Sequence, residues 1–310
     1  MKGETRLTTN SNVTGEKYGY FLGCVMPAKM PWAEKATFLV ANKLGLNWDY
    51  MKETLCCVRP GVWKTLDPDT WLTMTGQNLA LAEKQGVTLV DSCNGCWISH
   101  YEALEELKDE PEKMEMVKEH LRKANMDFQG TVKVKHFLQV LYEDVGIEKI
   151  KANITNPLTN VRVMRHVGCH GRKLGDDVLP RYFDEILKAT GVQLVNTPYD
   201  SMCCGLLVYF SDPKIAIYRN VFKKFKFAQD LAVDGIVVIC SGCYDQFDRG
   251  VKVLQEEGDP TGVITEFDIP VLHFSEILAL AMGYKPEDFG MDVFRTVSPT
   301  KLISKIKEGR

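Results

Sequence analysis

Ten cysteines dominate the chemistry that this 310-residue chain could carry. They form two sets of five, and each set runs as one single cysteine, one adjacent pair and one C-x-x-C pair. The members are Cys24, Cys56, Cys57, Cys93 and Cys96, then Cys169, Cys203, Cys204, Cys240 and Cys243. Clustered thiolates are ligands for zinc or for iron–sulfur clusters. Because both sets have the same order, the sequence predicts two similar metal centres.

The number five favours an iron–sulfur centre in each set. A zinc site takes four Cys or His ligands, usually as two close pairs, and each set has only one pair of that form. A cubane cluster also takes four cysteines and would leave one over. Two adjacent side chains diverge in extended backbone, so they fit a larger or irregular cluster more easily. Zinc, disulfides and buried core cysteines are the weaker alternatives.

The spacing also indicates a duplicated domain. Each cysteine of the second set follows its counterpart by 145 or 147 residues, and the flanking segments are similar. A polar stretch near residues 150–160 separates the copies, which gives units at residues 18–155 and 156–290. The first unit has about ten extra residues, expected within 101–126. The tail, 291–310, contains apolar residues including Phe294, and would either dock a partner or pack back on its own domain.

Strand and helix patterns alternate in both units and predict an α/β fold with two Rossmann-like halves and mainly parallel sheets. Strands are expected at residues 17–22, 87–90, 132–135, 161–167, 193–195, 236–239 and 269–272. Helices are expected at residues 32–44, 70–85, 101–125 with a possible break at Pro111, 177–190 and 215–233. Binding crevices of such sheets lie beyond the carboxyl ends of the strands. Cys24, Cys93, Cys169 and Cys240 fall at those ends.

Composition excludes several classes of protein. The net charge of −3 gives no basic excess for binding nucleic acid, and 45% hydrophobic residues exclude a disordered chain. Neither a secretory signal nor a run of about 18 apolar residues is found, so a cytoplasmic location without a membrane span is expected. Glycine-rich nucleotide loops and ferredoxin-type cysteine runs are absent as well. Electrons for a redox centre must therefore come from another protein.

Histidines and cations near the cysteines are further candidates for the site. His170, Arg172 and Lys173 flank Cys169 and would either bind an anionic substrate or lie on solvated surface. His136 and His273 recur in both units, and they would either contact the site or simply open helices. His166 is a weaker candidate, and His100 and His120 are expected on helix surfaces.

The doubled five-cysteine pattern resembles the duplicated cysteine-rich CCG domain that characterises the B-subunit family of heterodisulfide reductases. The resemblance covers roughly residues 18–290, including the segments 21–27, 93–96 and 272–274. Glycine follows only the second adjacent pair, as Gly205, whereas Val58 follows the first. Leu206 and Leu207 stand where smaller residues are expected, so they could reshape the substrate pocket while the ligands stay intact.

The resemblance implies that each set holds one non-cubane 4Fe–4S cluster with all five cysteines as ligands. The two halves would face each other across a pseudo-twofold. The implied activity is reduction of the coenzyme M–coenzyme B mixed disulfide to two thiols by one-electron steps. The implied partners are a ferredoxin-like protein and a flavoprotein, both subunits of the same complex. The alternatives are a related protein that acts on another disulfide or sulfane substrate, or an electron-transfer subunit of a respiratory flavoenzyme.

Overall fold

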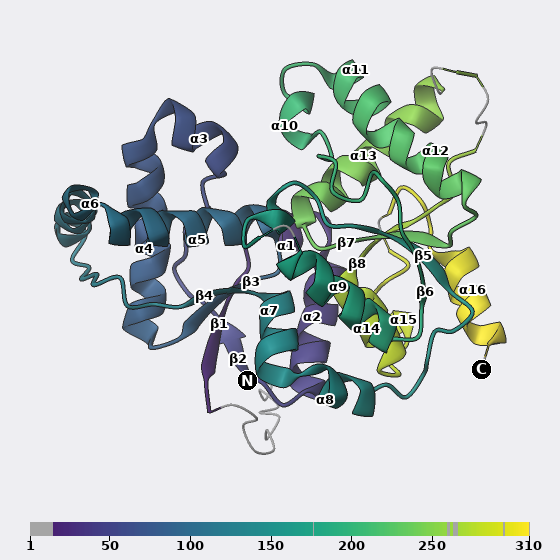
Figure 1. The fold of residues 1–310 in the computed structure, drawn as a ribbon, viewed down its shortest axis with the longest axis horizontal. Coiled ribbons are helices and arrows are strands. Elements are labelled where there is room, and N and C mark those ends of the chain that lie inside the picture. Colours follow the sequence, from purple (N-terminus) through teal and green to yellow (C-terminus); the bar gives the residue numbers. More distant parts are fainter. Residues whose placement is uncertain (1–14, 176, 259–260, 263–265, 294, 310) are drawn as a thin grey trace, which may run out of the picture.

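Two four-stranded parallel sheets organise the chain (Figure 1). The computed structural model describes residues 15–175, 177–258, 261–262, 266–293 and 295–309. The first sheet has the order β2-β1-β3-β4, with β1 Lys17–Phe21, β2 Asn47–Tyr50, β3 Thr88–Asp91 and β4 Val134–His136. The second has the matching order β6-β5-β7-β8, with β5 Arg162–His166, β6 Gln193–Val195, β7 Gly235–Val238 and β8 Val271–His273. The predicted α/β fold with two similar halves is confirmed.

Prolines set the starts of several helices in the first half. The helices are α1 Val25–Lys29, α2 Pro31–Lys43, α3 Pro60–Leu66, α4 Pro68–Gln85, α5 Asn94–Asp109, α6 Pro111–Lys123, α7 Phe137–Gln139 and α8 Ile147–Ala152, with a π-helical turn at Val140–Val145. A proline in the first turn needs no backbone donor there, which suits α2, α3, α4 and α6. Glu110 has extended backbone, so the predicted break before Pro111 is confirmed.

The second half repeats the strand order of the first and differs in its helices. It contains a 3₁₀ turn at His170–Arg172, a π-helical turn at Ala216–Val221, and α9 Val178–Ala189, α10 Leu206–Tyr209, α11 Pro213–Ile215, α12 Phe222–Asp230, α13 Ser241–Glu257, α14 Phe274–Ala281, α15 Pro286–Phe289 and α16 Thr300–Glu308. In the described residues between α13 and β8, no helix corresponds to α6, which explains the extra length of the first half. Over the described ranges, every helix is too short or too polar to cross a lipid bilayer.

The helices that follow the last strand of each sheet pack on the opposite half. α14 packs on α2, and α7 and α8 pack on α9, so these helices lie together between the two sheets in Figure 1. The rings of Phe137 and Phe274 lie 5.9 Å apart there, and both side chains are fully buried. One apolar core therefore runs through both halves and holds the cysteine-bearing edges of the two sheets against each other.

The tail packs back on the second half. Leu302 and Ile306 of α16 are buried in the shared core, and Lys305 forms an ion pair with Asp234 at 2.7 Å. This arrangement covers the apolar face of α16 within the chain itself. Phe294 lies outside the described residues.

Candidate metal centres

The strand ends deliver four cysteines to one region, as predicted. Cys24, Cys93, Cys169 and Cys240 each occupy the position just before a helix or helical turn that follows β1, β3, β5 or β7. Cys96 and Cys243 lie in the first turns of the long helices α5 and α13. A helix N-terminus carries partial positive charge and stabilises thiolates. Both C-x-x-C pairs therefore lie where anionic sulfur is favoured.

The adjacent cysteine pairs are held by the same kind of turn in both halves. Val58 and Gly205 both have left-handed backbone, with φ of 45° and 88°. Glycine is required at 205, because a Cβ there would lie 2.9 Å from Cβ of Asn220. Val58 takes the same region despite its branched side chain, and the Ser99 hydroxyl donates to its carbonyl at 3.1 Å. The first half therefore forms the same turn, although valine stands there in place of glycine.

The thiols form one continuous series across the two halves. Within each set, neighbouring thiols alter one another's pKa, and the same order of neighbours recurs in both sets. The two sets meet at Cys93 and Cys240, whose Sγ atoms are 3.6 Å apart. All ten cysteines are free thiols, so the disulfide alternative finds no support. The arrangement brings two five-thiol sets into direct contact.

Each set contains at least one thiol with a strongly lowered pKa. Hydrogen bonds from Cys24 and then Cys57 lower the pKa of Cys56 to about 2. The corresponding neighbours of Cys203 lower its pKa to about 2 as well. These thiols are anionic at neutral pH, and the thiolate is the form that binds metal.

A cavity of about 60 Å³ lies at the second set, where that set meets Cys93 of the first. All cysteines of the second set and Cys93 of the first line it, together with Arg59, His170, Leu206 and Leu207. Arg59 was not among the candidates from the sequence; it occupies the position that Leu206 holds in the other half. Its guanidinium reaches across the halves, because a Cβ on Gly242 would lie 3.5 Å from Nη2 of Arg59. The cavity therefore has a cationic side from the first half and an apolar side from the second.

The other cationic candidates lie outside this cavity. Arg172 is exposed, and Lys173 forms an ion pair with Glu102 at 2.9 Å. His100 was expected on a helix surface, and that prediction is wrong. Its ring is fully buried against Phe21 and its Nδ1 lies 3.0 Å from Asp91. His120 is exposed, as predicted.

His136 and His273 instead join the two halves. Nε2 of His136 lies 3.3 Å from the carbonyl oxygen of Ile239, and Nε2 of His273 lies 3.1 Å from that of Ser92. Ser92 and Ile239 are the residues just before the first cysteine of each C-x-x-C pair. Both rings are fully buried, and burial lowers the pKa of His136 to about 4 and that of His273 to about 3. The neutral rings therefore donate from Nε2 and fix each C-x-x-C turn to the opposite half.

This pairing makes His273→Phe a test of the contact between the halves. The buried carbonyl of Ser92 loses its donor, which is expected to lower the free energy of unfolding by about 1–3 kcal/mol. Below pH 6.5 an unfolded histidine binds a proton that native His273 excludes, so wild-type stability falls as the pH drops toward 3. In the variant, this pH dependence of stability should be weaker by up to about 1.4 kcal/mol per pH unit. Anaerobic urea unfolding at two pH values measures both effects.

His120→Phe is the matched control, since it removes an exposed imidazole, and it is expected to leave both quantities unchanged. Equal stability and an equal pH slope for His273→Phe and wild type would contradict the assigned role of this ring.

Several features of the site suit a cluster with several irons. Both nitrogens of His166 are buried and lack a partner among the described residues, although the ring lies beside the second set. A sulfur-rich group would supply the acceptor that this ring lacks. Within the described ranges, no three His, Cys, Asp or Glu side chains surround a point suited to a single metal ion. Thiolates around an iron–sulfur cluster are shared among several irons.

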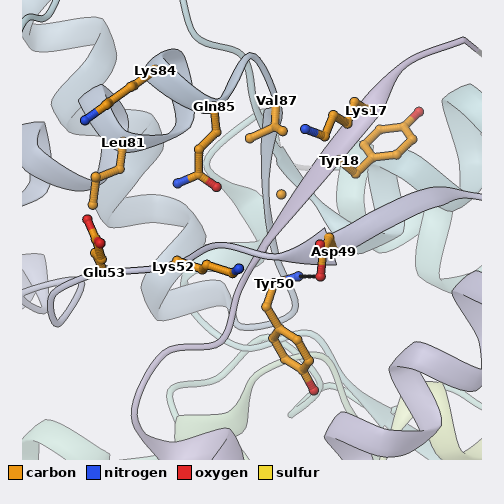
Figure 2. Close-up of a pocket in the computed structure, with 11 residues that line it drawn as sticks. Lys17, Tyr18, Asp49, Tyr50, Lys52, Glu53, Leu81, Lys84, Gln85 and Val87 are labelled. Atoms are coloured by element: carbon orange, nitrogen blue, oxygen red, sulfur yellow. Dashed lines mark hydrogen bonds between the residues drawn. The ribbon is translucent and has the colours of Figure 1, made fainter. Parts of the chain in front are cut away.

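A second cavity, of about 430 Å³, lies at the other edge of the first sheet (Figure 2). It opens beside the N-terminal ends of β1 and β3, and none of the cysteines lines it. Exposed Lys17, Lys52 and Lys84 surround it together with Asp49 and Glu53. This mixture of exposed charges carries no chemistry comparable to that of the thiol sets.

Comparison with known proteins agrees with the duplicated pattern. The CCG cysteine-rich domain family matches residues 18–99 and 163–248. The B subunit of the ferredoxin:CoB-CoM heterodisulfide reductase of Methanosarcina mazei is 35% identical, over 94% of this chain and 97% of that protein. The 8-methylmenaquinol:fumarate reductase membrane anchor subunit of Wolinella succinogenes is 28% identical, over 93% of this chain and 99% of that protein.

The fold also matches a solved structure, that of a hypothetical protein from Helicobacter pylori. The TM-score is 0.71 at 16% identity, and the match covers 94% of this chain and 55% of that longer chain. Two CCG domains, the preserved cysteine order and the 35% identity lead to one assignment. The chain belongs to the B-subunit family of heterodisulfide reductases, whose sequence is built on a duplicated CCG cysteine-rich domain.

Proposed function

We propose that the chain is the catalytic iron–sulfur subunit of a reductase complex that cleaves a disulfide to two thiols. One observation carries this proposal: the two five-thiol sets meet beside a cavity, with 3.6 Å between Sγ of Cys93 and Sγ of Cys240. Reduction of a disulfide takes two electrons. A duplicated site with one redox centre on each side of the substrate matches that requirement.

Each half, residues 18–155 and residues 156–290, is proposed to bind one non-cubane 4Fe–4S cluster. When bound, the two clusters supply one electron each. The first ligand set is Cys24, Cys56, Cys57, Cys93 and Cys96; the second is Cys169, Cys203, Cys204, Cys240 and Cys243. The chain's own contribution is to hold these thiolates at helix N-termini and in matched turns. Burial of Cys57 and Cys204 keeps water from the inner side of each set.

The coenzyme M–coenzyme B mixed disulfide is the proposed substrate, because the Methanosarcina relative is named for that heterodisulfide. Arg59 offers a guanidinium to an anionic group of the substrate, and His170 also lines the cavity. Leu206 and Leu207 form the apolar side. An unsymmetrical disulfide would thus meet different surroundings at its two ends.

The electrons are proposed to come from a ferredoxin-like protein and a flavoprotein that are subunits of the same complex. The chain itself has no glycine-rich nucleotide loop, so a flavin or nicotinamide site is not expected on it. Cys24, Cys56 and Cys169 are the exposed members of the thiol sets. They are the proposed ligands that an electron-donating subunit can approach most closely.

Electron transfer without disulfide chemistry is the second candidate. The likeness to the Wolinella fumarate reductase subunit, over nearly the full length of both chains, favours it. A related disulfide or sulfane substrate is a third candidate, supported by the two leucines at the cavity. Turnover of the mixed disulfide separates these candidates from the main proposal.

The test starts from anaerobically purified protein. Iron and acid-labile sulfide at about four of each per half, without zinc, are expected for two 4Fe–4S clusters. Reduced methyl viologen as electron donor should then support cleavage of the mixed disulfide. Stoichiometric zinc without sulfide would overturn the cluster proposal, and full clusters without disulfide turnover would favour the electron-transfer candidate.

Arg59→Gln tests the cationic side of the cavity. Loss of a hydrogen bond to a charged group costs about 1.5–3 kcal/mol, so KM should rise about 10- to 100-fold. Arg172→Gln is the matched control, because Arg172 is exposed and does not line the cavity. An unchanged KM in Arg59→Gln would remove this residue from the substrate site.

A further inference from the structure

We infer that the two cluster sites are electrically unequal, and that the second site has the higher reduction potential. A single electron added to the protein therefore resides on the second site. This inference rests on the proposed function, because it requires a cluster in each half. It is argued from side chains that differ between halves whose ligand sets are the same.

A buried cation lies beside the second set only. Lys224 on α12 is fully buried, and its ammonium donates to the carbonyls of Met202 and Cys203 at 2.9 and 3.4 Å. In the first half the matching contact comes from Asn78 on α4, whose amide donates at 3.2 Å to the carbonyl of Leu55, the residue that corresponds to Met202. The second set thus has a full positive charge where the first set has a neutral amide. Charges in such a buried place are weakly screened.

A free imidazole also faces the second set only. A Cβ built on Gly168 would lie 3.4 Å from Nε2 of His166 and 3.4 Å from Sγ of Cys243, so the ring edge and the thiol flank one small space. Both ring nitrogens are buried without a partner among the described residues. The ring can therefore donate its N–H to sulfur of the second site.

The first half arranges the same two ring types in the opposite way. There Phe21 packs on His100 at 4.5 Å, whereas His166 packs on Phe247 at 4.7 Å in the second half. The phenyl ring of Phe21 takes the place of the imidazole of His166 and offers no donor. His100 is occupied elsewhere, because its nitrogens contact Asp91 at 3.0 Å and Asn78 at 3.3 Å.

The remaining charges near the sets support the same difference. Asp91 places a buried carboxyl group two residues before Cys93, whereas Val238 stands at the matching place in the second half. Arg59 reaches from the first half toward Gly242 and the thiol of Cys240, so it favours added negative charge on both sites. Hydrogen bonds to sulfur and nearby positive charge raise the potential of an iron–sulfur cluster. Lys224 and His166 provide both at the second site.

The experiment is an anaerobic redox titration of the complete chain, followed by electron paramagnetic resonance. Wild type is expected to show two one-electron steps at different potentials. His166→Phe copies Phe21 of the first half, and Lys224→Asn copies Asn78. Each variant should move the higher-potential step downward and leave the lower one in place, and the double variant should bring the two steps closer together. His120→Phe, at an exposed position, should move neither step.

Iron and sulfide content of every variant is measured beside the titration. Two equal potentials in wild type would overturn the inference, and so would unchanged steps in both variants with full iron content. If one variant loses iron, the redox titration of the other variant tests the inference. A protein without iron or sulfide overturns the proposed function as well. Unequal potentials without turnover of the mixed disulfide would leave this inference standing and overturn the substrate alone.

Discussion

Replacing Cys204 by alanine is expected to remove about half of the iron and to abolish disulfide reduction, if each half binds one 4Fe–4S cluster. The Cys204 thiol is buried and lies between its neighbours Cys203 and Cys243 within the second set. Loss of a central ligand opens that set, whereas the first set keeps all five of its thiols. Reduction by two single electrons then lacks one of its two donors. Iron and sulfide analysis together with the turnover assay measures the result.

Cys57→Ala is the mirror variant, because Cys57 lies between Cys56 and Cys96 in the first set. It should also lose about half of the iron, from the other half of the chain. Each variant is the control for the other: the spectroscopic signal that survives in one should be the signal that is lost in the other. Iron content equal to that of wild type in Cys204→Ala would contradict the ligand assignment.

The sequence was sufficient to predict the strands that carry the cysteines. Strands β1, β3, β5 and β7 are mostly buried and each ends just before a cysteine, so their positions were visible in the sequence. The edge strand β2 was not predicted, because its four residues are only half-buried or exposed and carry no clear pattern. The helix predicted from residue 101 begins at Asn94, because the C-x-x-C segment forms its first turn.

Contacts between the halves were beyond sequence reasoning. His136 and His273 were visible as a repeated pair, but their partners are backbone carbonyls 103 and 181 residues away, which carry no side-chain signature. Arg59 was missed for a related reason. It breaks the repeat, and its place at the cavity depends on how α3 of one half packs beside α10 of the other. The repeat in the sequence identified the candidate ligands. Residues that depart from the repeat, such as Arg59, make the two sides of the cavity differ in charge.

A buried ion pair makes Arg295→Met the largest expected change in stability. The Arg295 guanidinium pairs with Glu276 on α14, donates to the Val271 carbonyl at 3.0 Å, and lies 4.8 Å from the ring of Trp32 on α2. Both charged side chains are almost completely buried, with 1% and 0% exposure. The pair therefore ties the tail to the second half and to a helix of the first.

Removal of the guanidinium leaves the Glu276 carboxylate buried without its counter-charge. Breaking such a pair on one side typically costs about 3–5 kcal/mol, whereas an exposed pair is worth about 0–1 kcal/mol. Anaerobic urea unfolding of Arg295→Met should show the larger loss. Arg249→Met should show the smaller one, because its partner Asp245 lies one turn away on the more accessible face of α13.

The double variant Arg295→Met/Glu276→Leu distinguishes the stranded charge from simple loss of packing. With both charges replaced by apolar groups, most of the lost stability should return, because neither variant side chain needs a partner. Recovery stays incomplete, since Glu276 also accepts from the backbone N–H of His273 at 2.8 Å and caps α14. A double variant no more stable than Arg295→Met would mean that the contacts to Trp32 and Val271, and not the charge of Glu276, hold the tail in place.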